Sequence, residues 1–364
     1  MYEYHTSERP PEIEMLRSEA RGQTFVSAKA PKRIYADDPD AARYLFTVGD
    51  GNRWMELGER EPEPKMLFGE FWQQGELCVL FADTNAGKSV LAVQIGNAIS
   101  RGRQIGPFAN NAKPANVLYV DFELSARQFQ LRYSNPKGNY NFSANFFRAQ
   151  FNADELMPGN FETYDEFVIA GLEQKIELVK ATVLIIDNIT CLRSGTESGA
   201  VAQRLMKSLR TLKTAHNLSV LVLSHTPKRN AARPISRDDL QGSKMLINFA
   251  DSAFAIGCSY SRPGLRYLKQ IKQRNTAEQY GEQNVCLCSI AKPRNFLQFE
   301  FTGNGHECEH LYHRTHVERE RLAQKIAELT KQGLSQRNIS KELSISLTTV
   351  NRLHTSRQTA PTAE

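Results

Sequence analysis

The fold is decided by residues 82–89, which read Ala82-Asp83-Thr84-Asn85-Ala86-Gly87-Lys88-Ser89. An apolar run, Glu76–Ala82, leads into this stretch, and a helical run that starts at Val90 follows it. A strand, a loop and a helix in this order are typical of a loop that wraps its backbone N–H groups around phosphate. We therefore predict that residues 82–90 bind the phosphates of a nucleotide.

Three side chains of this loop have predicted roles. Gly87 lets the backbone approach the phosphates, Lys88 places a charge on the β and γ oxygens, and the Ser89 hydroxyl can bind Mg²⁺. Ala82 stands where the strict motif has its first glycine, and an alanine fits there if its φ angle is negative. The cofactors implied are ATP and Mg²⁺.

A second strand supplies the acidic residue that is predicted to bind the metal. The β-branched run Thr182–Asp187 would be buried, which brings Asp187 to the carboxyl edge of the sheet beside Ser89. There it can hold Mg²⁺ through water. A strand-end aspartate is also a common helix cap, but the phosphate loop upstream favours the metal role.

A third strand, Val117–Val120, is followed by Asp121 and Glu123. An acid is needed to orient and activate the water that attacks the γ-phosphate. We choose Glu123 and keep Asp121 as the alternative. An acid here could instead cap the next helix, but Ser125 already suits that position.

The spacing of apolar and amphipathic stretches along the chain predicts its fold class. Between about residue 65 and residue 302, short apolar runs alternate with longer amphipathic stretches, which indicates an α/β fold. We expect a mainly parallel sheet flanked by helices, with antiparallel strands at one edge, and a turn over residues 300–305. The predicted strands are Leu77–Ala82, Asn116–Val120, Thr182–Ile186, Ser219–Leu223, Ser252–Ile256, Leu265–Ile271 and Val285–Ile290.

Changes in composition divide the chain into five parts. Residues 1–64 are polar and rich in proline pairs, and are predicted to form an N-terminal arm or small subdomain. Residues 65–305 form the nucleotide-binding domain and residues 306–316 a linker. Residues 317–357 form a small all-α domain, and residues 358–364 a disordered tail.

Charge and composition limit the partners and the compartment. The net charge is +6, and nine Lys/Arg stand against five Asp/Glu after residue 313, so the C-terminal part favours a polyanion partner. No apolar run approaches the roughly 18 residues of a membrane span. The N-terminus has no export pattern, and the six cysteines are scattered, so we expect a reduced, cytoplasmic protein without a membrane partner.

These motifs, in this order, resemble the RecA-like superfamily of hexameric ATPases and helicases. Within it, the resemblance is to the plasmid RepA-type ATPases and the DnaB-like replicative helicases, and it covers residues 65 to about 302. It implies a homo-oligomeric ring, usually a hexamer. Nucleotide would bind between subunits, and single-stranded DNA would pass through a central channel.

Two further runs extend the resemblance. The run Leu221–Thr226 looks like the family's sensor strand, in which a polar residue reads the γ-phosphate, and here that residue is His225. The run Lys272-Gln273-Arg274-Asn275 is similar to one in replicative helicases whose Lys and Arg reach the γ-phosphate of the neighbouring subunit. Carried over, this makes Lys272 and Arg274 catalytic cations that act in trans.

In such a ring, the loops after the metal-acid strand and the sensor strand face the channel. Here these are residues 193–199 and 226–244. Mobile, positively charged loops suit sequence-independent contact with DNA phosphates, although a basic surface loop is the alternative. The predicted DNA contacts in the second loop are Lys228, Arg229, Arg233, Arg237 and Lys244.

Residues 333–353 resemble the trihelical helix-turn-helix of resolvases and response regulators, with Ser335 and Ser346 as N-caps. A three-helix cap that docks on the ATPase domain or on a protein partner is the alternative to duplex DNA binding. The expected core residues are Ile339, Leu343, Ile345 and Val350. The residues expected to face duplex DNA are Leu347, Thr348, Asn351 and Arg352.

One cluster is interpreted as a linker. Residues 306–316 contain four histidines and Cys308. Cys308 with two histidines could bind zinc, but the spacing is not a standard ligand pattern.

The sequence therefore predicts an ATP-hydrolysing ring motor on DNA, helicase-like, that serves replication or mobilisation of a plasmid or mobile element. The alternative is an ATP-switched DNA-binding regulator or assembly factor that does not unwind DNA. A KaiC-like or RadA-like kinase or recombinase is disfavoured because the extra domains expected of one are missing.

Overall fold

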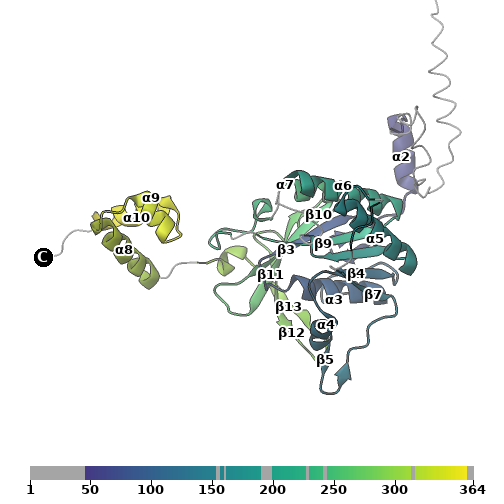
Figure 1. The fold of residues 1–364 in the computed structure, drawn as a ribbon, viewed down its shortest axis with the longest axis horizontal. Helices are drawn as coiled ribbons and strands as arrows, with labels where there is room; N and C mark the ends of the chain where they lie inside the picture. Colours follow the sequence, from purple (N-terminus) through teal and green to yellow (C-terminus); the bar gives the residue numbers. More distant parts are fainter. Residues whose placement is uncertain are drawn as a thin grey trace, which may run out of the picture.

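The computed structural model describes residues 46–152, 156–159, 161–189, 199–226, 229–240, 244–312 and 316–358. A nine-stranded sheet forms its centre, in the order β13-β12-β11-β10-β3-β9-β8-β4-β7 (Figure 1). Its strands are β3 (Leu77–Ala82), β4 (Val117–Asp121), β7 (Phe146–Gln150), β8 (Val183–Asp187), β9 (Ser219–His225), β10 (Ser252–Cys258), β11 (Leu265–Lys272), β12 (Val285–Ala291) and β13 (Gln298–Gly305).

The strands from β10 to β7 run parallel, and β11, β12 and β13 add antiparallel at one edge. This confirms the predicted RecA-like α/β fold. Strand β9 lies between β3 and β8, so the strand of the phosphate loop does not pair with the strand that ends in Asp187. Residues 300–305 were expected to turn, but they continue strand β13, which pairs with β12 through Gly305. Two small hairpins pair β1 (Met66–Phe68) with β2 (Trp72–Gln73), and β5 (Ser134–Asn135) with β6 (Gly138–Asn139).

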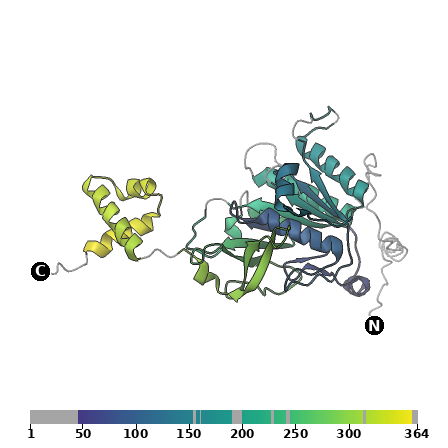
Figure 2. The same ribbon diagram turned by 90° about the horizontal axis from the view of Figure 1, so that it is seen from below.

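Helices cover both faces of the sheet. Helix α3 (Lys88–Arg101) packs with the aromatic residues of one hydrophobic cluster, whereas α5 (Tyr164–Val179), α6 (Gly199–Ala215) and α7 (Lys244–Phe249) pack into the other (Figures 1 and 2). The short helices α4 (Ala126–Arg132), η3 (Arg237–Asp239) and η4 (Glu307–His310) lie in the connections. The parallel strands therefore have a buried core on each side, as their continuous apolar sequences require.

Helix α2 (Gly51–Arg60) precedes the sheet and stands at its margin (Figure 1). It has an Asp50 N-cap and buries none of its residues. It is the only helix described within the predicted N-terminal arm, of which residues 1–45 lie outside the described part of the chain. Among the described residues, no helix combines the length and the apolar character needed to cross a membrane.

The C-terminal part is a separate three-helix unit of α8 (His316–Lys331), α9 (Gln336–Glu342) and α10 (Leu347–Gln358), and it stands apart from the sheet (Figures 1 and 2). Ile326, Leu329, Ile339 and Val350 form its core, with Leu343 and Ile345 packed against it. Both expected serine caps are present, since Asn338 N donates to Ser335 Oγ and Thr349 N to Ser346 Oγ.

Candidate active site

The phosphate loop runs from the end of β3 into α3. Gly87, at the N-cap, has φ +104°, and a Cβ there would lie 2.5 Å from Ile290 Cδ1. The positive φ favours glycine at this position, and a Cβ would also force Ile290 to shift. Ala82 ends strand β3 and is not among the described residues with positive φ, so alanine fits there without strain. Val90 is buried in the first turn of α3.

Lys88 is buried beneath the loop. Its Nζ donates to the carbonyl oxygens of Ala82 at 3.0 Å and Asp83 at 3.1 Å, and lies 3.1 Å from His225 Nδ1. Burial lowers the pKa of this amine, whereas Asp187, Glu123 and Asp83 act in the opposite direction. The cation therefore stands next to three carboxylates at the carboxyl edge of the sheet.

Asp187 and Ser89 lie together, as predicted for a metal pair. Their side chains are hydrogen-bonded, and Tyr119 Oη donates to Asp187 Oδ2 at 2.5 Å. Burial raises the pKa of Asp187 to about 6, although both hydrogen bonds oppose that shift. A hydroxyl and a buried carboxylate are hard oxygen donors that suit Mg²⁺, and the cation would favour the ionised carboxylate.

Glu123 faces the same cluster from the loop after β4. Asn188 Nδ2 donates to Glu123 Oε1, and His225 Nε2 lies 3.6 Å from the same oxygen. The neighbouring His225 imidazole is the largest of the influences that lower the pKa of this carboxyl group. Glu123 is therefore held as a carboxylate, which is the form that a general base requires.

Asp121 is engaged elsewhere. Its Oδ1 accepts the backbone N–H groups of Glu123 at 3.0 Å and Leu124 at 2.9 Å, and its Oδ2 pairs with Arg148 at 3.0 Å. The Asp121 side chain is completely buried. This geometry makes Asp121 the brace of the loop that carries Glu123, and it favours Glu123 over Asp121 as the base.

Lys272 and Arg274 lie at the amino ends of the parallel strands, on the side of the sheet opposite the phosphate loop. Lys272 Nζ donates to the carbonyl oxygens of Ile247 and Ala250, both at 2.7 Å, and Arg274 Nη1 pairs with Asp251 Oδ1 at 3.1 Å. Asp251 also accepts the N–H of Leu77, the first residue of β3. The phosphate loop follows the last residue of this strand, so the structure does not bring the two cations to the chain's own nucleotide site.

The basic residues of the loop after β9 differ in exposure. Arg229 was predicted to contact DNA, but its side chain is only 5% exposed and its Nε lies 3.8 Å from Asp83 Oδ2. Arg233 and Arg237 are exposed, and Arg237 Nε donates to Ile271 O at 3.2 Å. Lys228, the Lys244 side chain and the loop 193–198 lie outside the described residues.

The histidine-rich segment after β13 is partly structural. Glu307 is fully buried and accepts from Lys269 Nζ at 2.5 Å, Ile235 N at 2.7 Å and Tyr267 Oη at 3.1 Å. His310 is buried beside Tyr267, whereas Cys308 is exposed. In the described part of the chain, this segment gathers no group of metal ligands. His313 lies outside that part.

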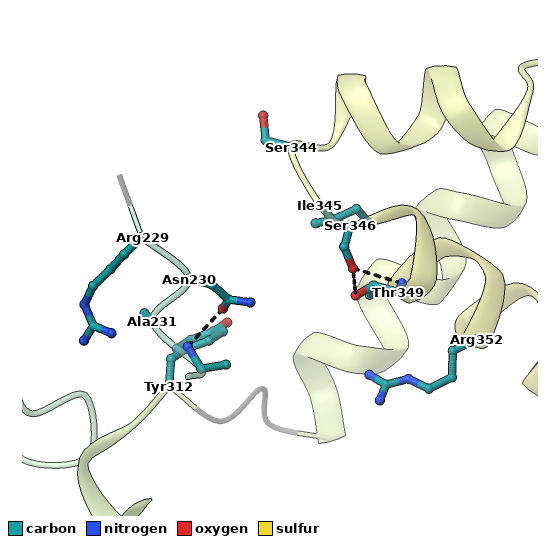
Figure 3. Close-up of a pocket in the computed structure, with 10 residues that line it drawn as sticks. Arg229, Asn230, Ala231, Tyr312, Ser344, Ile345, Ser346, Thr349 and Arg352 are labelled. Atoms are coloured by element: carbon teal, nitrogen blue, oxygen red, sulfur yellow. Dashed lines mark hydrogen bonds between the residues drawn. The ribbon is translucent and has the colours of Figure 1, made fainter. Parts of the chain in front are cut away.

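A pocket lies between the sheet domain and the three-helix unit, and residues of both line it (Figure 3). Among the ten described residues that line it, two are arginines and none is acidic. Arg229 points away from α10, and Arg352 extends from α10 toward the gap (Figure 3). Leu347, Thr348, Asn351 and Arg352 are all exposed on α10, as the predicted DNA-facing surface requires.

Sequence reasoning missed three side chains that contact the site residues. Asn188 contacts Glu123, Arg148 braces Asp121, and Arg266 Nε donates to the loop carbonyl of Ala86 at 2.8 Å. Asn188 follows Asp187 directly and could have been found from that position. Arg148 and Arg266 reach the site across the fold and carry no local signal.

Comparison with known protein families gives a match over the part of the chain that contains these residues. Residues 50–231 match the model of the AAA domain family, so the match spans the phosphate loop, Glu123, Asp187 and His225. The chain belongs to the AAA domain family, and it is a P-loop ATPase.

Among solved structures, a KaiC-like protein from the archaeon Pyrococcus horikoshii OT3 is similar in fold, with a TM-score of 0.42 and 13% sequence identity. The match covers 63% of this chain and 91% of that chain. A search of curated proteins found no significant match.

Proposed function

We propose that this chain is an ATP-driven ring motor on DNA, helicase-like, that serves replication or mobilisation of a plasmid or mobile element. The observation that carries the proposal is that the predicted catalytic residues lie at two opposite ends of the parallel strands. The phosphate loop, the metal pair and Glu123 lie at the carboxyl edge, whereas Lys272 and Arg274 lie at the other.

The residues at the carboxyl edge suit hydrolysis of ATP. Lys88 would exchange its carbonyl acceptors for the β and γ oxygens, and Ser89 with Asp187 would hold Mg²⁺, which neutralises phosphate charge. Water attacks the γ-phosphorus, the bond to the bridging oxygen breaks, and ADP leaves. Glu123 accepts the proton that the water loses.

The separation of the two edges supports assembly. Strand β3 has six residues, and at about 3.3 Å per residue its ends are roughly 17 Å apart. Arg274 therefore cannot reach the γ-phosphate of its own subunit. Its side chain is 46% exposed, so a neighbouring subunit could receive it.

Contact with DNA is proposed at two places. Arg233 and Arg237 are exposed on the loop after β9 and could meet a phosphate backbone in the channel. The polar face of α10 suits duplex DNA, and the exposed Arg352 on this helix lines the pocket beside it, which has no acid among its described residues.

ATPase rate with and without single-stranded DNA, measured together with oligomer mass, tests the proposal. A ring motor should form an oligomer with nucleotide, and single-stranded DNA should raise its turnover. Turnover by a monomer that is indifferent to DNA would contradict both parts.

A second function has one observation in its favour. Thr226 Oγ1 and Arg229 both contact Asp83 in the phosphate loop, and Tyr312 N donates to Ala231 O at 3.0 Å just before the three-helix unit. This path could let ATP control DNA binding without unwinding. Strand displacement by the purified protein separates the candidates, since only the motor releases a strand.

A further inference from the structure

Asn188 is a buried amide that contacts Glu123 in the active site. It follows Asp187 at the end of β8, is 1% exposed, and donates from Nδ2 to Glu123 Oε1. Its Nδ2 also lies 3.0 Å from His225 Nε2. A buried amide that reaches a half-exposed carboxylate on the loop after another strand is placed to orient that carboxylate.

The protons around His225 show how the contacts are arranged. The ammonium of Lys88 can only donate, so His225 Nδ1 accepts at 3.1 Å and the neutral ring carries its proton on Nε2. That N–H points into the cluster formed by Asn188 and Glu123, where Glu123 Oε1 is 3.6 Å away. The Asn188 amide and the His225 ring both lie near the same carboxylate oxygen, Glu123 Oε1.

This convergence has a consequence for the other oxygen. Both contacts fall on Glu123 Oε1, which leaves Oε2 as the atom that can take a proton from water. The backbone of Glu123 is held separately, because its N–H donates to Asp121 Oδ1 at 3.0 Å. Asp121 therefore fixes the loop, and Asn188 fixes the side chain.

We propose that Asn188 is a positioning residue that orients the Glu123 carboxylate, so that Oε2 faces the attacking water. The inference rests on the ATPase function proposed above. His225 alone is a weaker support, because its 3.6 Å separation from Oε1 exceeds a normal hydrogen bond.

Two substitutions separate donation from packing. Asn188→Asp keeps the shape but removes the donor, and Asn188→Ala removes both. Each should lower kcat by about 10–100-fold, because misplacement of a catalytic group by about 1 Å costs about that much. KM for ATP should change less than about threefold, since Lys88 and the loop amides still bind the phosphates. Normal turnover by Asn188→Asp would overturn the proposed donor role.

Asn116→Ala is the matched control. Asn116 Nδ2 donates to Val179 O at 2.8 Å, at the opposite end of the strand that leads to Glu123. This variant loses a comparable part-buried amide bond but should keep normal kcat and KM. An equal fall in kcat for Asn116→Ala and Asn188→Ala would assign the effect to general loosening and overturn the proposal.

A double-mutant cycle supplies the decisive readout. If Asn188 acts through Glu123, then Asn188→Ala should cause no further loss in single-turnover hydrolysis when Glu123 is already glutamine. Losses that multiply would show that Asn188 acts independently, and the proposal fails. Normal hydrolysis by Glu123→Gln alone would instead remove the proposed base, which is a failure of the parent function.

Discussion

At the scale of single residues, burial of the Asp187 carboxylate without nucleotide or metal lowers the stability of the folded protein. Asp187 is 2% exposed, and burial raises its pKa to about 6 from an ordinary value of 3.8. The folded chain therefore binds a proton that the unfolded chain has released between these values. Stability due to this group is present at low pH and is lost as the pH rises through that window.

Asp187→Asn should remove this pH dependence. Without nucleotide or Mg²⁺, the variant should have a higher urea midpoint than the wild type at pH 8, and nearly the same midpoint at pH 4. Metal-dependent ATPase activity should fall because the carboxylate ligand is lost. A wild-type advantage at pH 8 would show that Asp187 is not destabilised by burial.

Lys88→Ala tests the phosphate loop. The variant lacks the ammonium that is expected on the β and γ oxygens, and a charge-assisted bond of about 1.5–3 kcal/mol corresponds to roughly 10–100-fold in ATP affinity. Fluorescent-nucleotide titration measures it. Affinity within about threefold of wild type would remove the assignment.

Glu123→Gln and Asp121→Asn should behave differently. The first should bind ATP normally and lose about 10²–10⁴-fold in turnover, because the amide cannot accept the proton. The second should lower stability by weakening the pair with Arg148, and it should keep measurable turnover. Normal turnover by Glu123→Gln, with none by Asp121→Asn, would reverse the two roles.

At the scale of elements, the sequence predicted those parts whose signal is local. Buried strands such as β8 consist of continuous apolar residues, and the phosphate loop is one short run. Strand β7 was missed because Phe146–Gln150 contains Arg148 and is only partly buried, and β13 because Gln298–Gly305 is polar and rich in glycine. The burial of Arg229 against Asp83 depends on a long-range contact that the sequence does not encode locally.

Deletion of residues 317–364 tests the three-helix unit as an element. Its core is made of its own residues, so the sheet domain should keep its basal ATPase rate. Affinity for duplex DNA should fall and depend less steeply on salt, because phosphate contacts are lost. Fluorescence anisotropy across a salt series measures both. Unchanged duplex affinity would favour the protein-docking alternative.

At the scale of the whole molecule, Arg274→Ala tests assembly. The variant should bind ATP nearly normally but lose about 10³–10⁵-fold in turnover if the cation acts in trans. Mixing it with Lys88→Ala protein should restore part of the activity, because one subunit supplies Arg274 and the other the phosphate loop. Subunit exchange must be shown first, for instance by energy transfer between labelled copies. Exchange without any rescue would contradict the trans model.

If Arg274 acts in trans as proposed, its placement on the side of the sheet opposite the phosphate loop also limits how copies can associate. A subunit with a different surface at each end completes its neighbour's site only by head-to-tail contact, and a two-fold symmetric dimer is unsuited to it. In an open, linear assembly, the phosphate loop of one terminal subunit has no neighbour to supply Arg274. Only closure into a circle equips every member, so turnover per subunit should reach its full value when the circle closes.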